Sequence, residues 1–153
     1  MEIRKATLDD LPAIVEMLTD DEIGQTREDF KIPLPSSYVQ AFEKIIADPN
    51  QELIVIENEE GVVIGTMQLT FIQYLMYQGG IRAQIEAVQI KKEHRSQGIG
   101  SKMMNWAIAR AKERKAQLIQ LTSNKKRSKA IRFYEGFGFE ASHEGMKLYL
   151  SYL

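Results

Sequence analysis

The sequence contains no cysteine, and this absence narrows the chemistry that the chain can perform. Without cysteine there is no disulfide and no thiol nucleophile to carry a covalent acyl group. Histidine is nearly as scarce, with only His94 and His143. Neither belongs to a cluster with the spacing of metal ligands. We therefore expect no metal site, and a reducing compartment is compatible with this composition.

Long apolar runs are also absent. No stretch approaches the roughly 20 apolar residues of a membrane-spanning helix, and Met1–Ala6 lacks the basic and then apolar pattern of a secretory signal. The 153 residues, 44% hydrophobic and 27% charged, are typical of a globular chain with room for one well-buried core. We expect one domain over residues 1–153, in the cytoplasm and without a membrane partner.

Charge is distributed unevenly along the chain. The net charge is −1, yet the segment from Lys91 to Arg132 holds thirteen Lys and Arg against two Glu. A basic segment raises the local concentration of a polyanionic ligand. Nucleic acid is the alternative polyanion, but Trp106 is the only aromatic residue between Arg95 and Lys129, where base-stacking residues would be needed. We expect no nucleic-acid partner, and part of the basic charge is also explained by a solvated helix face.

A glycine-rich turn, Arg95-Ser96-Gln97-Gly98-Ile99-Gly100, lies between an apolar strand over 85–90 and a long helix. Apolar residues at helical spacing mark that helix: Ile99, Met103, Ala107 and Ala111. The first N–H groups of a helix have no partner inside it, and together they can bind a pyrophosphate. A short Gly-x-Gly match also occurs in tight connections that bind nothing, so the prediction depends on this strand–turn–helix context.

A second motif covers Ala130–Phe139, where a short helix carrying Phe133 and Tyr134 ends at Gly136. Together the two segments resemble the GNAT superfamily of acetyl-CoA-dependent N-acetyltransferases, and the order of elements from Ile3 to Leu150 also fits. The resemblance implies an α/β (α+β) fold of one domain. Its central sheet would be mixed and mostly antiparallel, with helices on both faces, which strands around a helix beside several hairpins also favour.

The resemblance further implies acetyl-CoA as co-substrate. Arg95, Gly98 and Gly100 would hold its pyrophosphate together with the amides from Gln97 to Ser101. Asn124 would contact the cofactor or its thiol region, and a turn-forming asparagine is its alternative role. The backbone of a strand can form hydrogen bonds with an extended ligand, so Val88 and Ile90 would pair with the pantetheine arm of the cofactor. The predicted cofactor-binding residues are Val88, Ile90, Arg95, Gln97, Gly98, Ile99, Gly100, Ser101 and Asn124.

Two residues are candidates for the chemistry. A phenol with a pKa near about 10 stays protonated at neutral pH, so Tyr134 suits protonation of the departing thiolate; a core aromatic is its alternative role. Glu86 is the acid of the strand over 85–90 and, if partly buried, would have a raised pKa suited to a general base. Glu86 facing solvent or pairing with Arg82 is the alternative. Backbone N–H groups around Val88 would stabilise the oxyanion.

The acceptor is less constrained. Residues 121–127, the Arg132-Phe133-Tyr134 helix and Ser142-His143 resemble the aminoalkylphosphonate acetyltransferase branch, which implies a small primary amine with an anionic group. Protein or peptide acetylation is the alternative if Thr19–Ser37 forms an open groove and not a lid or wall. A non-catalytic acetyl-CoA-binding regulatory module is another alternative, and a homodimer stays open beside a monomer.

The remaining elements follow from periodicity and turn residues. Residues 71–80 either extend a hairpin or line a pocket, with Phe71 in the core. Thr7–Asp10 forms a capping box before a helix carrying Leu11 to Leu18. Other helices are expected over 38–47, 99–114 and 128–135. Strands are expected over 3–6, 53–57, 62–70, 81–90 and 117–122, with a closing hairpin of 139–142 and 146–152.

Overall fold

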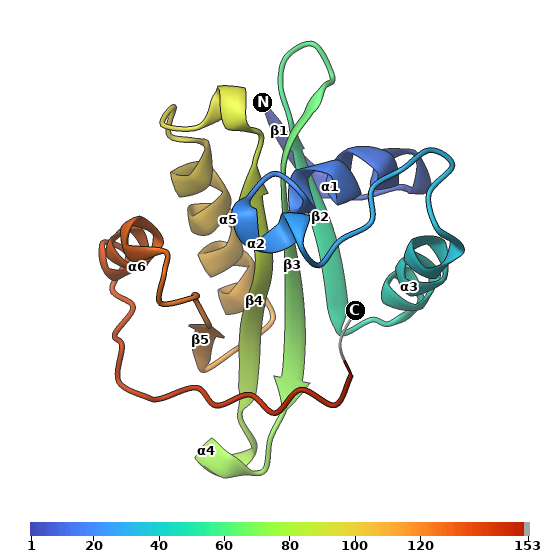
Figure 1. Ribbon diagram of the computed structural model, residues 1–153. Helices are drawn as coiled ribbons and strands as arrows, with labels where there is room; N and C mark the ends of the chain where they lie inside the picture. The colour runs from blue at the N-terminus through green and yellow to red at the C-terminus, as the bar shows by residue number, and fades with distance from the viewer. Residues whose placement is uncertain (152–153) are drawn as a thin grey trace. The chain divides into compact units, whose positions relative to one another are not determined.

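A five-stranded sheet in the order β1-β2-β3-β4-β5 forms the centre of the computed structural model, which describes residues 1–151 (Figure 1). The chain divides into two compact units, Met1–Gln120 and Leu121–Leu153, and each is described by itself. The strands are β1 (Glu2–Lys5), β2 (Gln51–Glu57), β3 (Val63–Gln73), β4 (Ile81–Ile90) and β5 (Leu118–Leu121). The α-helices are α1 (Leu11–Leu18), α2 (Glu22–Gln25), α3 (Ser36–Ala47), α4 (Met76–Gly79), α5 (Ile99–Glu113) and α6 (Ser128–Glu135). Short 3₁₀ helices η1 and η2 cover Leu8–Asp10 and Lys92–His94.

The sheet is mixed and mostly antiparallel, as predicted. β1 pairs with β2, β2 with β3 and β3 with β4, all antiparallel. The Gln117 amide donates to the Ile81 carbonyl at 2.8 Å, at the start of both strands. Further along, the Gln120 side chain contacts Arg82 and Gln84. β5 therefore runs parallel to β4. Neighbouring parallel strands need a crossover connection, and helix α5 provides it between β4 and β5.

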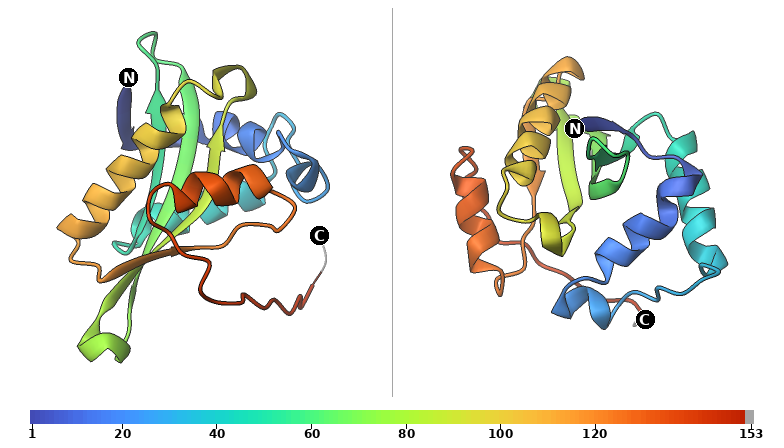
Figure 2. Two further views of the ribbon diagram at one scale, coloured as in Figure 1. Left: turned by 90° about the vertical axis from the view of Figure 1, so that its left-hand side faces the viewer. Right: turned by 90° about the horizontal axis from the view of Figure 1, so that it is seen from above.

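Helices cover both faces of the sheet (Figure 2). On one face, α1 and α3 pack on the strands around a cluster of buried side chains: Ala6, Leu11, Ile14, Val15, Met17, Phe42, Val55 and Val63. On the other face, α5 buries Met103 and Met104. The approach of α5 is close, since a Cβ on Gly65 of β3 would lie 3.0 Å from the Met103 sulfur. These two cores confirm the prediction of a sheet with helices on both faces.

The start of α1 is held by one buried carboxylate. Asp10 is 7% exposed and accepts hydrogen bonds from the Thr7 amide at 2.7 Å and hydroxyl at 3.1 Å. The Arg4 guanidinium binds the same carboxylate through both of its oxygens, at 2.7 and 3.0 Å. This arrangement ties β1 to the helix, and it confirms that Thr7 and Asp10 pair as the capping box predicts.

The second half of the segment 19–37 is held to α3 and to the core. The Tyr38 hydroxyl of α3 accepts from the Asp29 amide at 2.9 Å and donates to Glu28 at 3.1 Å. Phe30 and Leu34 pack against the core of the α1 face. The short helix α2 lies in the first half, where Asp21 accepts from the Gly24 amide.

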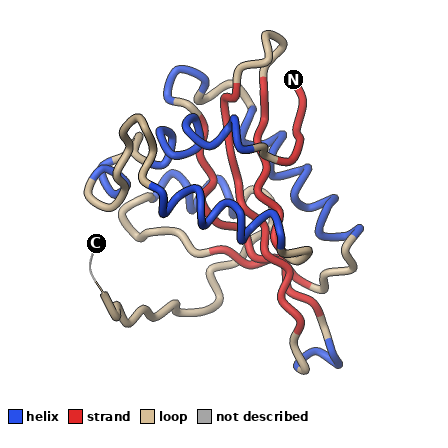
Figure 3. The backbone as a smooth tube through the Cα atoms, turned by 90° about the vertical axis from the view of Figure 1, so that its right-hand side faces the viewer, coloured by secondary structure: helices blue, strands red, loops and turns tan. Residues whose placement is uncertain are grey.

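The β3–β4 hairpin extends beyond the neighbouring strands and ends in α4 (Figure 3). β3 continues to Gln73, so residues 71–80 extend the hairpin, and Phe71 is buried as expected. Tyr77, Gln78 and Gly79 all have positive φ values, between 55° and 77°. The Gln73 side-chain amide holds this turn by donating to the Gly79 carbonyl at 2.8 Å.

In the second unit, α6 has the predicted bounds, but the predicted closing hairpin is wrong within the described residues. Residues 139–142 and 146–151 form no strand. A strand requires a hydrogen-bonded neighbour, and here Met146 and Leu150 are more than nine-tenths exposed. Tyr152, the predicted end of the hairpin, lies outside the described residues. β5 is half-buried and shorter than the buried strand predicted over 117–122.

Candidate active site

The glycine loop between β4 and α5 presents a row of unused backbone donors. Gly98 caps α5 in the left-handed conformation, with φ of 79°, and Ser96 is also left-handed, with φ of 62°. The Lys102 amide is the first to bond back, to the Gly98 carbonyl at 3.1 Å. Within residues 1–151 the amides from Gln97 to Ser101 have no acceptor. These free donors at a helix N-terminus fit the pyrophosphate of coenzyme A.

Arg95 holds the loop in place. Its Nε donates to the Ile90 carbonyl at 3.0 Å, and its Nη2 lies 3.5 Å from an Asp20 carboxylate oxygen. The guanidinium thus connects the end of β4 with the segment after α1. The resemblance implies a role for Arg95 at the pyrophosphate, which stays a prediction; in this structure its contacts are with the protein itself.

A β-bulge in β4 is the main feature that the sequence did not reveal. Thr66 of β3 faces Gln89 and Gln68 faces Glu86, so the single residue between them, Met67, faces both Ala87 and Val88. Ala87 has a φ of 54°, a conformation that L-residues other than glycine adopt at a cost of about 1–2 kcal/mol. A bulge leaves backbone groups of the extra residue unpaired. The bulge lies at Ala87 and Val88, where the oxyanion donor is predicted.

Glu86 lies immediately before the bulge, on the face of the sheet that α1 and α3 cover. It is exposed, so the partial burial expected for a base with a raised pKa is not found. Its carboxylate accepts from the Gln84 amide group at 2.8 Å. Arg82 does not pair with it within the described residues; the guanidinium instead donates to Gln120 and lies over the Tyr74 ring.

Tyr134 and Asn124 belong to the second unit. Tyr134 packs edge-on to Phe133 and Phe139, at centroid distances of 5.3 and 5.9 Å. Burial raises the pKa of its phenol, although the positive charge of Arg127 opposes the shift, so the group keeps its proton at neutral pH. The Asn124 side chain accepts from the Lys126 amide at 3.0 Å, which is the turn-forming role considered as its alternative.

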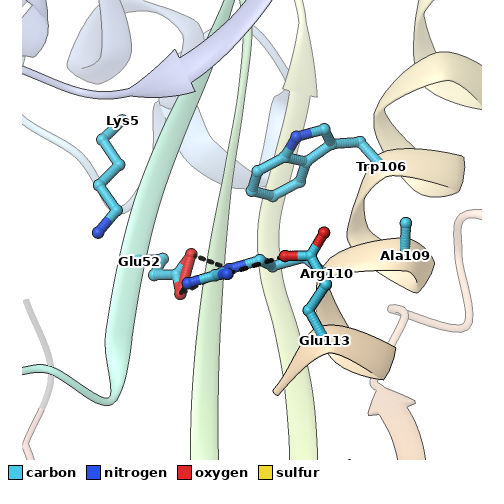
Figure 4. Close-up of a pocket in the computed structure, with 6 residues that line it drawn as sticks. All are labelled: Lys5, Glu52, Trp106, Ala109, Arg110 and Glu113. Atoms are coloured by element: carbon cyan, nitrogen blue, oxygen red, sulfur yellow. Dashed lines mark hydrogen bonds and ion pairs between the residues drawn. The ribbon is translucent and has the colours of Figure 1, made fainter. Parts of the chain in front are cut away.

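A cavity of about 320 Å³ lies on the α5 face of the sheet, opposite Glu86 (Figure 4). The Arg110 guanidinium stands between the Glu52 and Glu113 carboxylates there, with Trp106 above and Lys5 across from it (Figure 4). Because these carboxylates already bind arginine, we interpret the cluster as a structural clip between α5 and β2.

Within residues 1–151 no three His, Asp or Glu side chains come together as a metal site, and our expectation of no metal stays a prediction. No helix there is both long and apolar enough to span a bilayer.

Comparison with known proteins places this loop, bulge and helix in a defined class. The acetyltransferase (GNAT) family profile matches residues 14–139, and the chain belongs to this family. It is therefore an acetyl-CoA-dependent acetyltransferase. It is 27% identical over 143 residues to the aminoalkylphosphonate N-acetyltransferase of Salmonella typhimurium, a match that covers 93% of this chain and 86% of the relative.

Two solved structures show the same fold. A transcriptional regulator from Bacillus halodurans C-125 is 53% identical, with a TM-score of 0.94 over 97% of this chain and 99% of that chain. A predicted acetyltransferase from Clostridium acetobutylicum, solved with acetyl-CoA, is 23% identical, with a TM-score of 0.75 over 97% of this chain and 96% of that one. The sequence thus identified the family, while the bulge at Ala87 and the contacts of Arg82 carried no local sequence signal.

Proposed function

We propose that this enzyme transfers the acetyl group of acetyl-CoA directly to the primary amine of a small molecule, within a ternary complex. The observation that carries the proposal is the succession of Glu86, the β4 bulge and the glycine loop along one stretch of chain. The absence of cysteine supports direct transfer, because no thiol is present to carry the acetyl group. We further propose that the two units act as one catalytic domain.

The loop is proposed to bind the cofactor through its backbone. The amides of Gln97, Gly98, Ile99, Gly100 and Ser101 would donate to the pyrophosphate, with Arg95 fixing the loop, and Val88 and Ile90 would pair with the pantetheine arm. Bound acetyl-CoA supplies a thioester carbonyl carbon, whose C–S bond breaks as the C–N bond to the amine forms. Asn124 would contact the thiol region.

The proton transfers are assigned to two side chains. Glu86 would accept a proton from the ammonium group of the acceptor, directly or through water, so that the nitrogen becomes nucleophilic. The N–H beside Val88 would stabilise the negative charge that develops on the carbonyl oxygen. Tyr134 would give its proton to the departing thiolate and regain one from the nitrogen, which loses its extra proton when the amide forms.

An amine-panel assay that detects free coenzyme A tests this function. The panel contains aminoalkylphosphonates, polyamines, amino sugars, amino acids and peptides with free N-termini. Release of coenzyme A with a small amine, and not with peptides, supports the proposal. Preferential turnover of peptides supports protein or peptide acetylation instead.

A non-catalytic regulatory role is the second candidate, favoured by the description of the B. halodurans relative as a transcriptional regulator. Glu86 and Tyr134 are both present here and argue for catalysis. Binding of acetyl-CoA without turnover of any amine would support the regulatory role. A location in the cytoplasm remains our prediction, and a homodimer stays open beside a monomer.

A further inference from the structure

Arg82 differs from every other arginine in residues 1–120. Arginines in this unit pair with carboxylates at the following positions: Arg4 with Asp10 and Glu57, Arg27 with Glu28, Arg95 with Asp20, Arg110 with Glu52 and Glu113, and Arg114 with Glu52. Arg82 is half-buried, yet among the described residues it forms no ion pair. A guanidinium has five N–H donors, and a single side-chain acceptor, Gln120 at 2.7 Å, occupies Nη1 of Arg82.

The guanidinium is nevertheless held in a fixed position. Its central carbon lies 4.5 Å from the centroid of the Tyr74 ring and 5.9 Å from that of Tyr77. Aromatic faces attract a guanidinium and leave the N–H groups at its edge free to bind in plane. Arg82 is thus oriented without its charge being neutralised.

The turn that carries Tyr77 is strained. Tyr77 and Gln78 have positive φ values of 55° and 59°, which cost about 1–2 kcal/mol each in residues with a Cβ. Tyr77 is 56% exposed, so burial of its ring does not offset this cost. Strain without a packing gain is typical of positions that serve a site.

A chain of side-chain hydrogen bonds connects Arg82 with Glu86. Arg82 donates to Gln120, Gln120 donates to Gln84 at 2.8 Å, and Gln84 donates to Glu86 at 2.8 Å. We call these four residues the polar strip. Arg82, Gln84 and Glu86 alternate along β4 and so point to the same face, and four residues of strand span about 13 Å. The strip has a positive end, neutral amides in the middle and a negative end beside the bulge.

We propose that Arg82 binds an anionic group of the acceptor, so that the acceptor is a small zwitterionic amine with its ammonium group toward Glu86. This proposal rests on the acetyl transfer proposed above and adds the side chain that binds the anionic group of the acceptor. A phosphonate, phosphate or carboxylate group matches the open donors of a guanidinium. The relative from S. typhimurium acts on an aminoalkylphosphonate, which belongs to this class.

The test compares acceptors that differ only at one end. Wild-type protein is assayed with ω-aminoalkylphosphonates, ω-amino acids and ω-amino alcohols of equal chain length, and the ratio of kcat/KM for the anionic acceptor to that for the alcohol is measured. The phosphonate and carboxylate arms separate the two kinds of anion. Arg82→Gln should lower this ratio about tenfold or more, through the KM of the anionic acceptor, because a charge-assisted hydrogen bond is lost. Arg82→Lys should restore part of it, and Lys112→Gln, which removes one positive charge from an exposed position on α5, should keep the wild-type ratio.

Binding is measured separately from turnover. Calorimetry with an aminoalkylphosphonate and protein saturated with coenzyme A should show at least about tenfold weaker binding to Arg82→Gln. Equal affinities, equal selectivity ratios in the two proteins, or a preference for peptides over zwitterionic amines would overturn the proposal. Arg82-dependent binding without acetylation of any amine would instead keep the anion site and overturn the proposed function.

Discussion

Arg110 of α5 donates three hydrogen bonds to the carboxylate of Glu52 on β2, at distances of 2.8 to 3.1 Å. Glu52 is 3% exposed, and Arg114 one turn further along the helix binds the same carboxylate at 3.1 Å. A buried carboxylate is tolerated only when its charge is compensated in this way. The helix that begins at the glycine loop is therefore fixed to the sheet at its far end.

Replacing Glu52 with glutamine should destabilise the protein. The change leaves two half-buried guanidinium groups without their shared counter-charge, and we expect the free energy of unfolding to fall by about 2–3 kcal/mol. Chemical denaturation measures it. Glu113→Gln is the control, because Glu113 binds the same arginine but is 65% exposed, and it should cost less than about 0.5 kcal/mol. Equal effects of the two variants would contradict the buried clip.

Stability at acidic pH should depend on Asp10. Hydrogen bonds from Arg4, followed by those from Thr7, outweigh burial and hold the pKa of Asp10 below its usual value. The stabilisation is complete above the unfolded-state pKa of about 3.9 and is lost as the pH falls through the lower folded-state pKa. Asp10→Asn should therefore be less stable than wild type at pH 7, and the difference should shrink below pH 4. Urea midpoints across this range measure it, and a constant difference would exclude the ionised pair as its source.

Cofactor affinity should depend on the backbone of the glycine loop. Gly98→Val should weaken acetyl-CoA binding severely, because the side chain blocks the approach of the pyrophosphate to the free amides. Gly61→Val is a matched control: Gly61 has a φ of 77° in the β2–β3 turn, close to the 79° of Gly98, and each Cβ would meet open space. Both variants carry similar backbone strain. Calorimetry should show lost affinity in the loop variant alone, and equal affinities would remove the loop from the cofactor site.

Removing the Tyr134 hydroxyl should slow the reaction without weakening cofactor binding. In Tyr134→Phe we expect kcat to fall by about 10 to 10⁴-fold, since the ring remains and only the proton donor is lost. Because burial raises the pKa of this phenol, wild-type kcat should begin its decline at alkaline pH only above about pH 10, where the donor ionises. That decline at high pH should be missing in the variant. An unchanged kcat would assign Tyr134 to aromatic packing with Phe133 and Phe139.

The role of Glu86 is tested by the pH profile. Glu86→Gln should lower the rate most where the acceptor is an ammonium ion, and rising pH should restore part of the activity because free amine forms in solution. Glu113→Gln, on the opposite face, should keep the wild-type profile. A Glu86 variant with wild-type rate and profile would leave water or prior deprotonation of the substrate as the route.

Elements defined by neighbouring residues were predicted well from the sequence. The glycine loop, the capping box at Asp10 and helix α6 each depend on signals within a few positions. The closing hairpin was wrong because the alternating pattern in residues 146–151 indicates a strand without supplying its neighbour. An alternating pattern describes one strand and does not show whether a second strand is present to pair with it.

The site was predicted only in part, for a related reason. The apolar neighbours of Glu86 in the sequence leave its burial open, and the structure shows the side chain exposed, as in the alternative that it faces solvent. The contact of Arg82 with Gln120 joins residues 38 positions apart, and no local pattern indicates it. The bulge arises at an alanine, where the sequence offers neither glycine nor asparagine as a sign of a left-handed residue.

That extra residue also exchanges odd and even positions along β4. Before it, the even-numbered Arg82, Gln84 and Glu86 share the α1 face; after it, the odd-numbered Gln89 lies on that face, opposite Thr66. Deleting Ala87 alone would leave Val88 opposite Met67 and keep Glu86, Gln89 and Ile90 on their present faces, so the deletion would remove the bulge without disturbing either core. The extra residue therefore serves the backbone geometry next to Glu86 and not the separation of buried from exposed side chains along β4.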